Sequence, residues 1–378
     1  MRWDIFCRVI DNFGDVGVCW RLAADLAARG HTVRLWLDDC QALAWMAPVA
    51  LKGQWPGITV HPWSDASKPE VLSTLTPAQV WVEGFGCELP DAFVAWRAST
   101  QAAAPVWINL EYLSAESFVE RSHGLPSPVM SGPAKGWTKH FFYPGFTPRT
   151  GGLLREPDLL AQQKAFGSAE RRAFLKGLKV ADHGETLVTL FCYSHAPVAG
   201  LLRALHGATT GVHLLVTHGQ AQGAVHAALA TAPQLGEALR ITDLPLLSQT
   251  EFDQLLWISD LNFVRGEDSL VRALWAGRPF VWQIYPQHDG AHRAKLDAFL
   301  SVLDAPRAVR EWHSQWNSLD AAGVDFPLPL DNLTPDSKAW QAWAAGLAPQ
   351  LGYQADLVTQ LCAFVQGVDS RRQGPKTR

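Results

Sequence analysis

Arg265-Gly266-Glu267-Asp268-Ser269 joins two stretches of different character. The apolar residues just before it predict a buried strand, and those just after it, 270–276, predict a helix. The pentapeptide is therefore a turn at the start of a helix, where unpaired backbone N–H groups favour a diphosphate. Ser269 adds a hydroxyl donor and Arg265 a positive charge. A capped helix in a parallel sheet, with Asp268 or Ser269 as N-cap, explains these five residues equally well.

The two acids of this turn need a different explanation from the turn itself. Carboxylates beside a phosphate would repel it. We therefore expect Glu267 and Asp268 to face sugar hydroxyls or a basic acceptor.

Composition limits the class of protein. The chain has 378 residues, 48% hydrophobic and 18% charged, which is enough for two domains with full cores. A formal net charge of −4 argues against a nucleic-acid-binding protein. No apolar run is long enough to span a membrane, and the first residues run directly into a strand, so we expect no membrane segment and no signal peptide. The six cysteines and 13 histidines show no metal-ligand spacing. The cysteines are scattered along the chain, so we expect free thiols in a cytoplasmic protein.

A second strand–turn–helix unit opens the chain. The sequence predicts a strand at 5–10, a helix at 18–29 and a strand at 32–37. Asp11 and Asp15 share the loop between the first strand and the helix, beyond the end of a strand, where open parallel sheets bind ligands. One of them can be a general base. Turn formation by Asp11 and helix capping by Asp15 are the alternative.

The alternation of strands and helices continues in both halves of the chain. Further predicted strands are 57–60, 79–83, 105–109, 186–191, 212–216, 239–242 and 279–283. Two doubly wound α/β domains facing a cleft fit this pattern better than an eight-fold barrel. Residues 122–152, rich in glycine, proline and aromatics, predict a structured loop on the rim of that cleft, or a packed surface loop.

This arrangement suggests a nucleotide-sugar transferase. The chain has no Asp-x-Asp pair, which commonly binds the metal of a nucleotide sugar, so we expect a metal-independent enzyme. The helix dipole, Ser269 and Arg265 would then stabilise the leaving diphosphate.

The motifs together resemble the EarP family, protein-arginine rhamnosyltransferases that modify bacterial elongation factor P. The motifs that carry the resemblance are Asp11-Asn-Phe-Gly-Asp15 with Gly17, Trp107-Ile-Asn-Leu-Glu-Tyr-Leu-Ser114, His123-Gly-Leu-Pro-Ser-Pro128, Phe191-Cys-Tyr193, Gln249 with Phe252-Asp-Gln-Leu-Leu-Trp257, and Arg265-Gly-Glu-Asp-Ser269. The resemblance covers nearly the whole chain. It implies a GT-B fold with a first domain at 1–155, a crossing at 156–182, a nucleotide-sugar domain at 183–349 and a C-terminal helix, 350–370, that joins the first domain.

The resemblance also implies a reaction. Its donor is dTDP-β-L-rhamnose, its acceptor is an arginine of elongation factor P, the anomeric centre is inverted, and no metal or other cofactor takes part. We expect a monomer. The resemblance implies that Asp15 is the base, with Asp11 and Glu267 as further catalytic residues. The implied nucleotide-sugar contacts are Asn12, Phe13, Gly14, Gly17, Phe191, Tyr193, Gln249, Phe252, Arg265, Glu267, Asp268 and Ser269. Leu246 stands where an aromatic would help to hold the base, which leaves Phe252 as the main stacking candidate.

An arginine acceptor suits the acids of these motifs. A guanidinium with a pKa above about 12 is a poor nucleophile while protonated, and paired carboxylates can orient it and accept a proton. Two other functions fit the sequence. One is a GT-B enzyme with a lipid or glycan acceptor, for which no clear basic amphipathic surface is found. The other is a non-catalytic nucleotide-sugar-binding protein.

Overall fold

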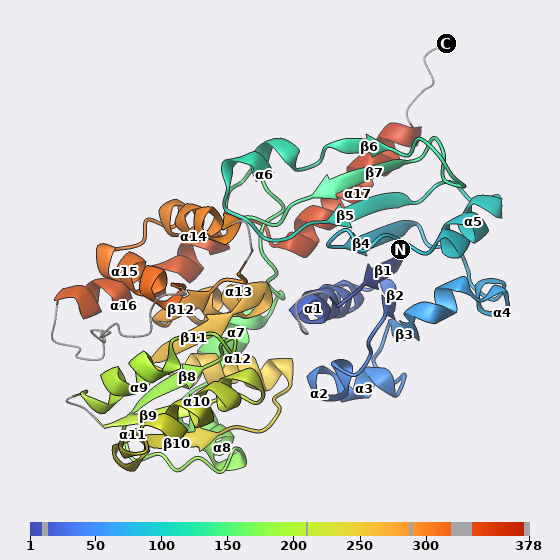
Figure 1. Cartoon of the computed structure of the whole chain (residues 1–378). Helices are drawn as coiled ribbons and strands as arrows, with labels where there is room; N and C mark the ends of the chain where they lie inside the picture. Colours follow the sequence, from blue (N-terminus) through green and yellow to red (C-terminus); the bar gives the residue numbers. More distant parts are fainter. Residues whose placement is uncertain (10–13, 209–210, 287–289, 319–334, 374–378) are drawn as a thin grey trace. The chain divides into compact units, whose positions relative to one another are not determined.

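The chain forms two compact α/β units in the computed structural model, which describes residues 1–9, 14–208, 211–286, 290–318 and 335–373 (Figure 1). The first unit comprises Met1–Glu156 and Gln354–Arg378, and the second comprises Pro157–Tyr353. The segment 156–182, expected to cross between domains, contributes two helices to the second unit.

The first unit is built on one sheet that has seven strands among the described residues, in the order β3-β2-β1-β4-β5-β7-β6. Its strands are β1 (Arg2–Cys7), β2 (Thr32–Leu37), β3 (Ile58–Pro62), β4 (Val80–Gly84), β5 (Val106–Leu110), β6 (Pro126–Pro128) and β7 (Thr138–Phe142). Its helices are α1 (Gly14–Ala28), α2 (Leu43–Met46), α3 (Pro48–Leu51), the 3₁₀ helix η1 (Trp63–Ser67), α4 (Pro69–Leu72), α5 (Asp91–Ser99), α6 (Ser117–Ser122) and α17 (Leu357–Gln373). β1 has β2 on one side and β4 on the other, both parallel to it. The order of the strands therefore reverses at β1/β4, and ligands of open α/β sheets bind at the carboxyl ends of strands at such a point.

The stretch 122–152, expected as a loop, contains two strands. β7 pairs in parallel with β5, and β6 pairs antiparallel with β7 at the edge of the sheet. β6 is only three residues long and has proline at both ends, which an edge strand tolerates because one side of it needs no ladder hydrogen bonds. The prolines and glycines of this stretch made it resemble a loop in the sequence. Its strand β7 pairs with β5, which lies earlier in the chain.

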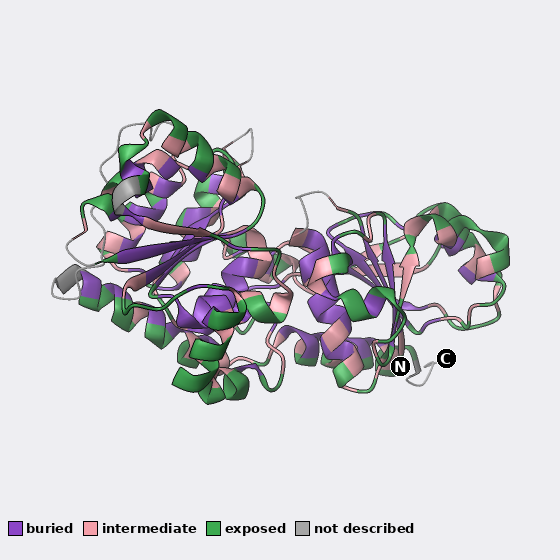
Figure 2. Cartoon of the chain, turned by 90° about the horizontal axis from the view of Figure 1, so that it is seen from below, coloured by how far each residue is buried: buried purple, intermediate pink, exposed green. Residues whose placement is uncertain are grey.

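Aromatic side chains fill one face of the first sheet. Phe6, Trp36, Trp81 and Trp107 come from four neighbouring strands and pack with Phe93 of α5. The rings of Phe6 and Trp36 are stacked, with centroids 5.5 Å apart. Figure 2 shows the strands of each sheet largely buried and the exposed residues on the outer sides of the helices.

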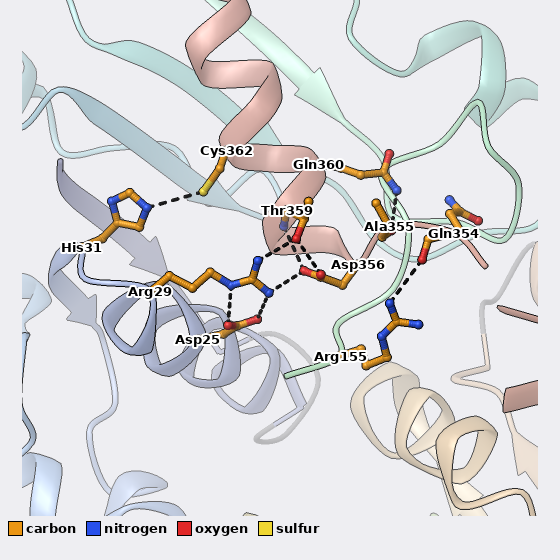
Figure 3. Close-up of polar contacts among 10 residues, drawn as sticks. All are labelled: Asp25, Arg29, His31, Arg155, Gln354, Ala355, Asp356, Thr359, Gln360 and Cys362. Carbon is orange, nitrogen blue, oxygen red and sulfur yellow. Dashed lines mark hydrogen bonds and ion pairs between the residues drawn. The ribbon is translucent and has the colours of Figure 1, made fainter. Parts of the chain in front are cut away.

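The C-terminal helix α17 packs on the first unit through α1 (Figure 3). Arg29 at the end of α1 pairs with Asp25, with 2.7 Å between Nε and Oδ1, and with Asp356, with 2.7 Å between Nη2 and Oδ1. It also donates to Thr359 Oγ1 at 2.6 Å. This side chain therefore ties together two segments that are more than 300 residues apart in the sequence.

The second unit has a parallel sheet that has five strands in the described part, in the order β10-β9-β8-β11-β12. Its strands are β8 (Thr186–Leu190), β9 (Val212–Val216), β10 (Arg240–Asp243), β11 (Leu261–Arg265) and β12 (Phe280–Gln283). Its helices are α7 (Leu159–Ala165), α8 (Ser168–Gly177), α9 (Val198–His206), α10 (Gln220–Thr231), α11 (Gln234–Ala238), α12 (Gln249–Ile258), α13 (Gly266–Ala276), α14 (Ala291–Val302), α15 (Arg307–Trp316) and α16 (Pro335–Gly352). The strand order reverses here between β8 and β11, so the segments that follow these two strands mark the expected ligand site.

Candidate active site

The turn Arg265–Ser269 leads from β11 directly into α13. Gly266 has a φ of +66°, a conformation that glycine adopts without strain and that allows the helix to begin immediately. The N-cap residue is Arg265, so the alternative of Asp268 or Ser269 as N-cap is wrong. The Ser269 hydroxyl accepts from the Arg265 N–H at 3.0 Å and donates to the Arg265 carbonyl oxygen, so it closes the turn.

The guanidinium of Arg265 lies against the segment that follows β8. Its Cζ is 4.6 Å from the ring centroid of Phe191 and 4.6 Å from that of Tyr193, which are cation–π distances. The two segments meet because the Phe191 N–H donates to the Phe263 carbonyl of β11 at 2.9 Å. The structure therefore brings three of the expected residues together where the strand order reverses.

Helix α12 adds a further aromatic ring. The ring of Phe252 packs edge-on against Phe191, with centroids 5.4 Å apart. Gln249, also expected at this site, is the first residue of the same helix, and both side chains are half-buried. Leu246, in the preceding loop, is 48% exposed.

A buried ion pair fixes α12 against α13. Arg272 Nη2 lies 2.7 Å from Asp253 Oδ2, and Arg272 Nε lies 2.9 Å from Asp253 Oδ1. Both side chains are nearly inaccessible to water. Asp253 follows Phe252, and Arg272 lies one helical turn after Asp268. The ion pair therefore sets the position of the Phe252 ring relative to the start of α13.

The two acids of the turn occupy the first turn of α13, where the helix dipole stabilises negative charge. Glu267 is ion-paired with Lys295 of α14, with 2.7 Å between Oε1 and Nζ. Asp268 is half-buried beside it. The sequence reasoning missed Lys295, because only the fold places α14 against this turn.

Two other polar residues at this site escaped the sequence reasoning. Gln283, buried at the end of β12, accepts the Tyr193 N–H at 2.7 Å, and its Nε2 lies 3.2 Å from His195 Nε2. His195 stacks on Tyr193, and its partial burial and the charge of Arg265 lower the pKa of His195. A polar residue ending an apolar strand was a usable signal for Gln283. The other missed residue is Gln220, whose side chain contacts Arg265.

Asp15 lies in the first turn of α1 in the first unit, with Gly14 and Gly17. It is buried, at 3% exposure. The causes that raise the pKa of Cys7 include a side-chain hydrogen bond with Cys19, burial and the nearby carboxylate of Asp15. Asp15 therefore lies near the carboxyl end of β1. Asp11, Asn12 and Phe13 lie outside the described residues.

The loop that follows β4 lies beside this end of β1. A Cβ on Gly84 would lie 2.9 Å from the Phe6 carbonyl and 3.0 Å from Cys19 Sγ, so the close approach requires glycine. The next residue, Phe85, has a φ of +57°, and its ring stacks on Tyr112 with centroids 4.4 Å apart. Strained non-glycine residues cluster at functional sites, which makes this loop a further candidate for the site.

Two other features are absent from the described ranges. No group of three or more His, Cys, Asp or Glu side chains is arranged to hold a metal ion. Across the same residues, no helix has the length and apolar character needed to cross a membrane.

Comparison with known proteins relates this geometry to a family. Residues 3–366 match the family model described as Elongation-Factor P (EF-P) rhamnosyltransferase EarP. A protein-arginine rhamnosyltransferase of Pseudomonas putida is 48% identical over 383 residues, covering 96% of this chain and 98% of the relative. One of Pseudomonas aeruginosa is 39% identical, with the same shares covered.

Solved structures agree with these relatives. The structure described as "Structural basis for EarP-mediated arginine glycosylation of translation elongation factor EF-P" has a TM-score of 0.62 and 31% identity, and covers 97% of this chain and 99% of that chain. TcCGT1 in complex with UDP, at 10% identity and a TM-score of 0.53, covers 98% of this chain and 99% of its own and shares the fold alone. The chain therefore has the GT-B glycosyltransferase fold and belongs to the EarP family of protein-arginine rhamnosyltransferases.

Proposed function

We propose that this protein transfers L-rhamnose from dTDP-β-L-rhamnose to an arginine side chain of translation elongation factor P, with inversion at the anomeric carbon. Membership of the EarP family supports the reaction class. The observation that carries the donor assignment is the guanidinium of Arg265, which lies on the rings of Phe191 and Tyr193 beside the start of α13.

The donor binds to the second unit in this proposal. The charge of Arg265 and the N-terminal N–H groups of α13 attract the diphosphate and stabilise it as the leaving group. Phe252, with Phe191 behind it, offers an aromatic surface for thymine, and Gln249 offers an amide for its polar edge. Glu267 and Asp268 are acceptors for the sugar hydroxyls.

The acceptor reaction uses carboxylates. A guanidinium nitrogen attacks the anomeric carbon, the new C–N bond forms as the bond to the diphosphate oxygen breaks, and dTDP leaves with the electron pair. Asp15 accepts the proton that the guanidinium loses, and Asp11 and Glu267 orient the planar group through hydrogen bonds. Lys295 holds one oxygen of Glu267, which fixes the direction of that carboxylate.

The proposal needs no metal and no cofactor. The positive charge that a metal would bring to the diphosphate is supplied by a guanidinium and a helix N-terminus. A glycosyltransferase with a different acceptor and a non-catalytic nucleotide-sugar-binding protein are the competing functions.

Intact-mass analysis of elongation factor P separates these functions. We expect incubation with this protein and dTDP-β-L-rhamnose to add one deoxyhexose to a single arginine. Factor in which that arginine is replaced by lysine should stay unmodified, and so should factor incubated without donor. An unmodified factor together with donor hydrolysis would indicate a different acceptor. Donor binding without any turnover would indicate a non-catalytic binding protein.

A further inference from the structure

Gln220 contacts the guanidinium of Arg265 from a different part of the second unit. It is the first residue of α10, which follows β9 and its connecting turn. Its Oε1 accepts from Arg265 Nη1 at 2.8 Å and from the Ser194 N–H at 3.1 Å. The same Arg265 Nη1 lies 3.4 Å from the Cys192 carbonyl oxygen. One amide oxygen thus joins the arginine to the segment that carries the aromatic rings.

These contacts restrict the arginine in complementary ways. The rings of Phe191 and Tyr193, each 4.6 Å from Cζ, limit how far the guanidinium can move. A hydrogen bond to a single nitrogen fixes the rotation of its plane, and with it the direction of its N–H donors. An unrestrained arginine loses side-chain conformational entropy on binding, and restraint before the ligand arrives reduces that cost.

The chemistry of the partner matters as well. A carboxylate in the place of Gln220 would hold the guanidinium more strongly, but it would add a negative charge where an anion has to bind. An amide oxygen accepts the same hydrogen bond without a formal charge. A glutamine therefore orients the arginine and adds nothing that repels a phosphate.

We propose that Gln220 is a positioning residue of the donor site, which holds Arg265 in the orientation that binds the diphosphate of a nucleotide sugar. The inference rests on the proposed function, because it takes the turn at Arg265 as the diphosphate site. Gln220 acts through the arginine, so its effect depends on both the arginine and the phosphates.

Calorimetry with two ligands tests this dependence. Gln220→Ala should weaken dTDP binding about tenfold, as expected for loss of one hydrogen bond to a charged group, and leave the affinity for thymidine unchanged. Gln220→Met, which keeps the length of the side chain but has no acceptor oxygen, should give the same result. Gln222→Ala is the matched control, because this glutamine of the same helix donates instead to the Leu244 carbonyl at 2.8 Å. It should bind both ligands like the wild type, and melting temperatures verify that each variant is folded.

A double-mutant cycle completes the test. Arg265→Ala should weaken dTDP binding, and adding Gln220→Ala to it should have no further effect. Three outcomes would overturn the inference: unchanged dTDP affinity in Gln220→Ala, an equal loss of thymidine affinity, or the same loss in the Arg265→Ala background. The last would mean that Gln220 acts independently of Arg265. Wild-type protein that binds no dTDP would overturn the proposed donor, and the role of Gln220 with it.

Discussion

His313 makes the stability of the second unit depend on pH. It lies on α15 and is completely buried. Its Nε2 accepts the Trp282 N–H of β12 at 3.1 Å, so the ring proton sits on Nδ1, which lies 2.8 Å from the Val309 carbonyl. The indole of Trp282 donates in turn to the Gly266 carbonyl at 2.8 Å. A second proton on the ring would convert His313 Nε2 from an acceptor into a donor and break its hydrogen bond with the Trp282 N–H. Trp282 belongs to the strand that supports the turn at Gly266.

The size of the effect follows from the pKa. Burial lowers the pKa of His313 from 6.5 to about 4. The unfolded chain therefore binds the proton more readily than the folded chain. The stability contributed by the neutral ring is complete above about pH 6.5 and is lost as the pH falls toward 4. A difference of about 2.5 pKa units corresponds to about 3 kcal/mol across this window.

Urea unfolding of the wild type and of His313→Gln between pH 7.5 and pH 4.5 measures this contribution. Other histidines titrate in both proteins, so the informative quantity is the difference between their pH dependences. We expect the free energy of unfolding of the wild type to fall more steeply, by up to about 3 kcal/mol over the window. His206→Gln, at the exposed end of α9, is the control and should follow the wild type. Identical pH dependences for the wild type and His313→Gln would mean that protonation of His313 does not contribute to the pH dependence of stability.

Three further predictions concern the donor turn and its supports. Asp253→Asn leaves the guanidinium of Arg272 buried without its counterion and should lower the free energy of unfolding by about 3–5 kcal/mol, whereas Glu311→Gln in an exposed ion pair should leave it unchanged in the same denaturation series. Lys295→Met releases the carboxylate of Glu267 and should lower turnover by about 10–100-fold at saturating donor, with little change in melting temperature; wild-type kinetics would leave the ion pair without a catalytic role. Turnover should persist in excess EDTA, and activity that disappears with chelator and returns with magnesium would contradict the electrostatic role of the turn.

The strands were predictable where the chain is apolar and bounded by turn residues. Residues 212–216 form β9 as expected, because a strand buried on both faces is mostly apolar, here in every residue except His213. The first strand is three residues earlier than predicted, at Arg2–Cys7 instead of 5–10. Its register is set by pairing with Thr32–Leu37, which local hydrophobicity does not reveal. Helix α13 begins at Gly266 instead of 270, so the two acids lie within its first turn.

The candidate site was predictable only in part, because some of its contacts depend on how distant segments pack together. Phe191 follows β8 and Arg265 ends β11, and these strands lie side by side. The rule that parallel strands end at one edge of the sheet therefore brings the two residues together. Lys295 and Gln220 come from helices whose placement depends on packing of the whole unit. Their contacts to Glu267 and Arg265 follow no spacing in the sequence.

The catalytic role of Asp15 can be tested through one substitution. Asp15→Asn keeps the shape of a buried side chain and removes the basic oxygen. The donor is assigned mainly to residues of the second unit, whereas Asp15 belongs to the first. The variant, checked for its melting temperature, should therefore bind dTDP as the wild type does.

The most direct test of the proposed mechanism is the rate at which Asp15→Asn modifies elongation factor P, measured beside its dTDP affinity. Removal of a general base lowers a rate by about 10²–10⁴-fold, and we predict a loss of this size with unchanged affinity. Near-normal turnover would contradict the role of Asp15 as general base, and loss of turnover together with dTDP binding would make Asp15 a structural residue.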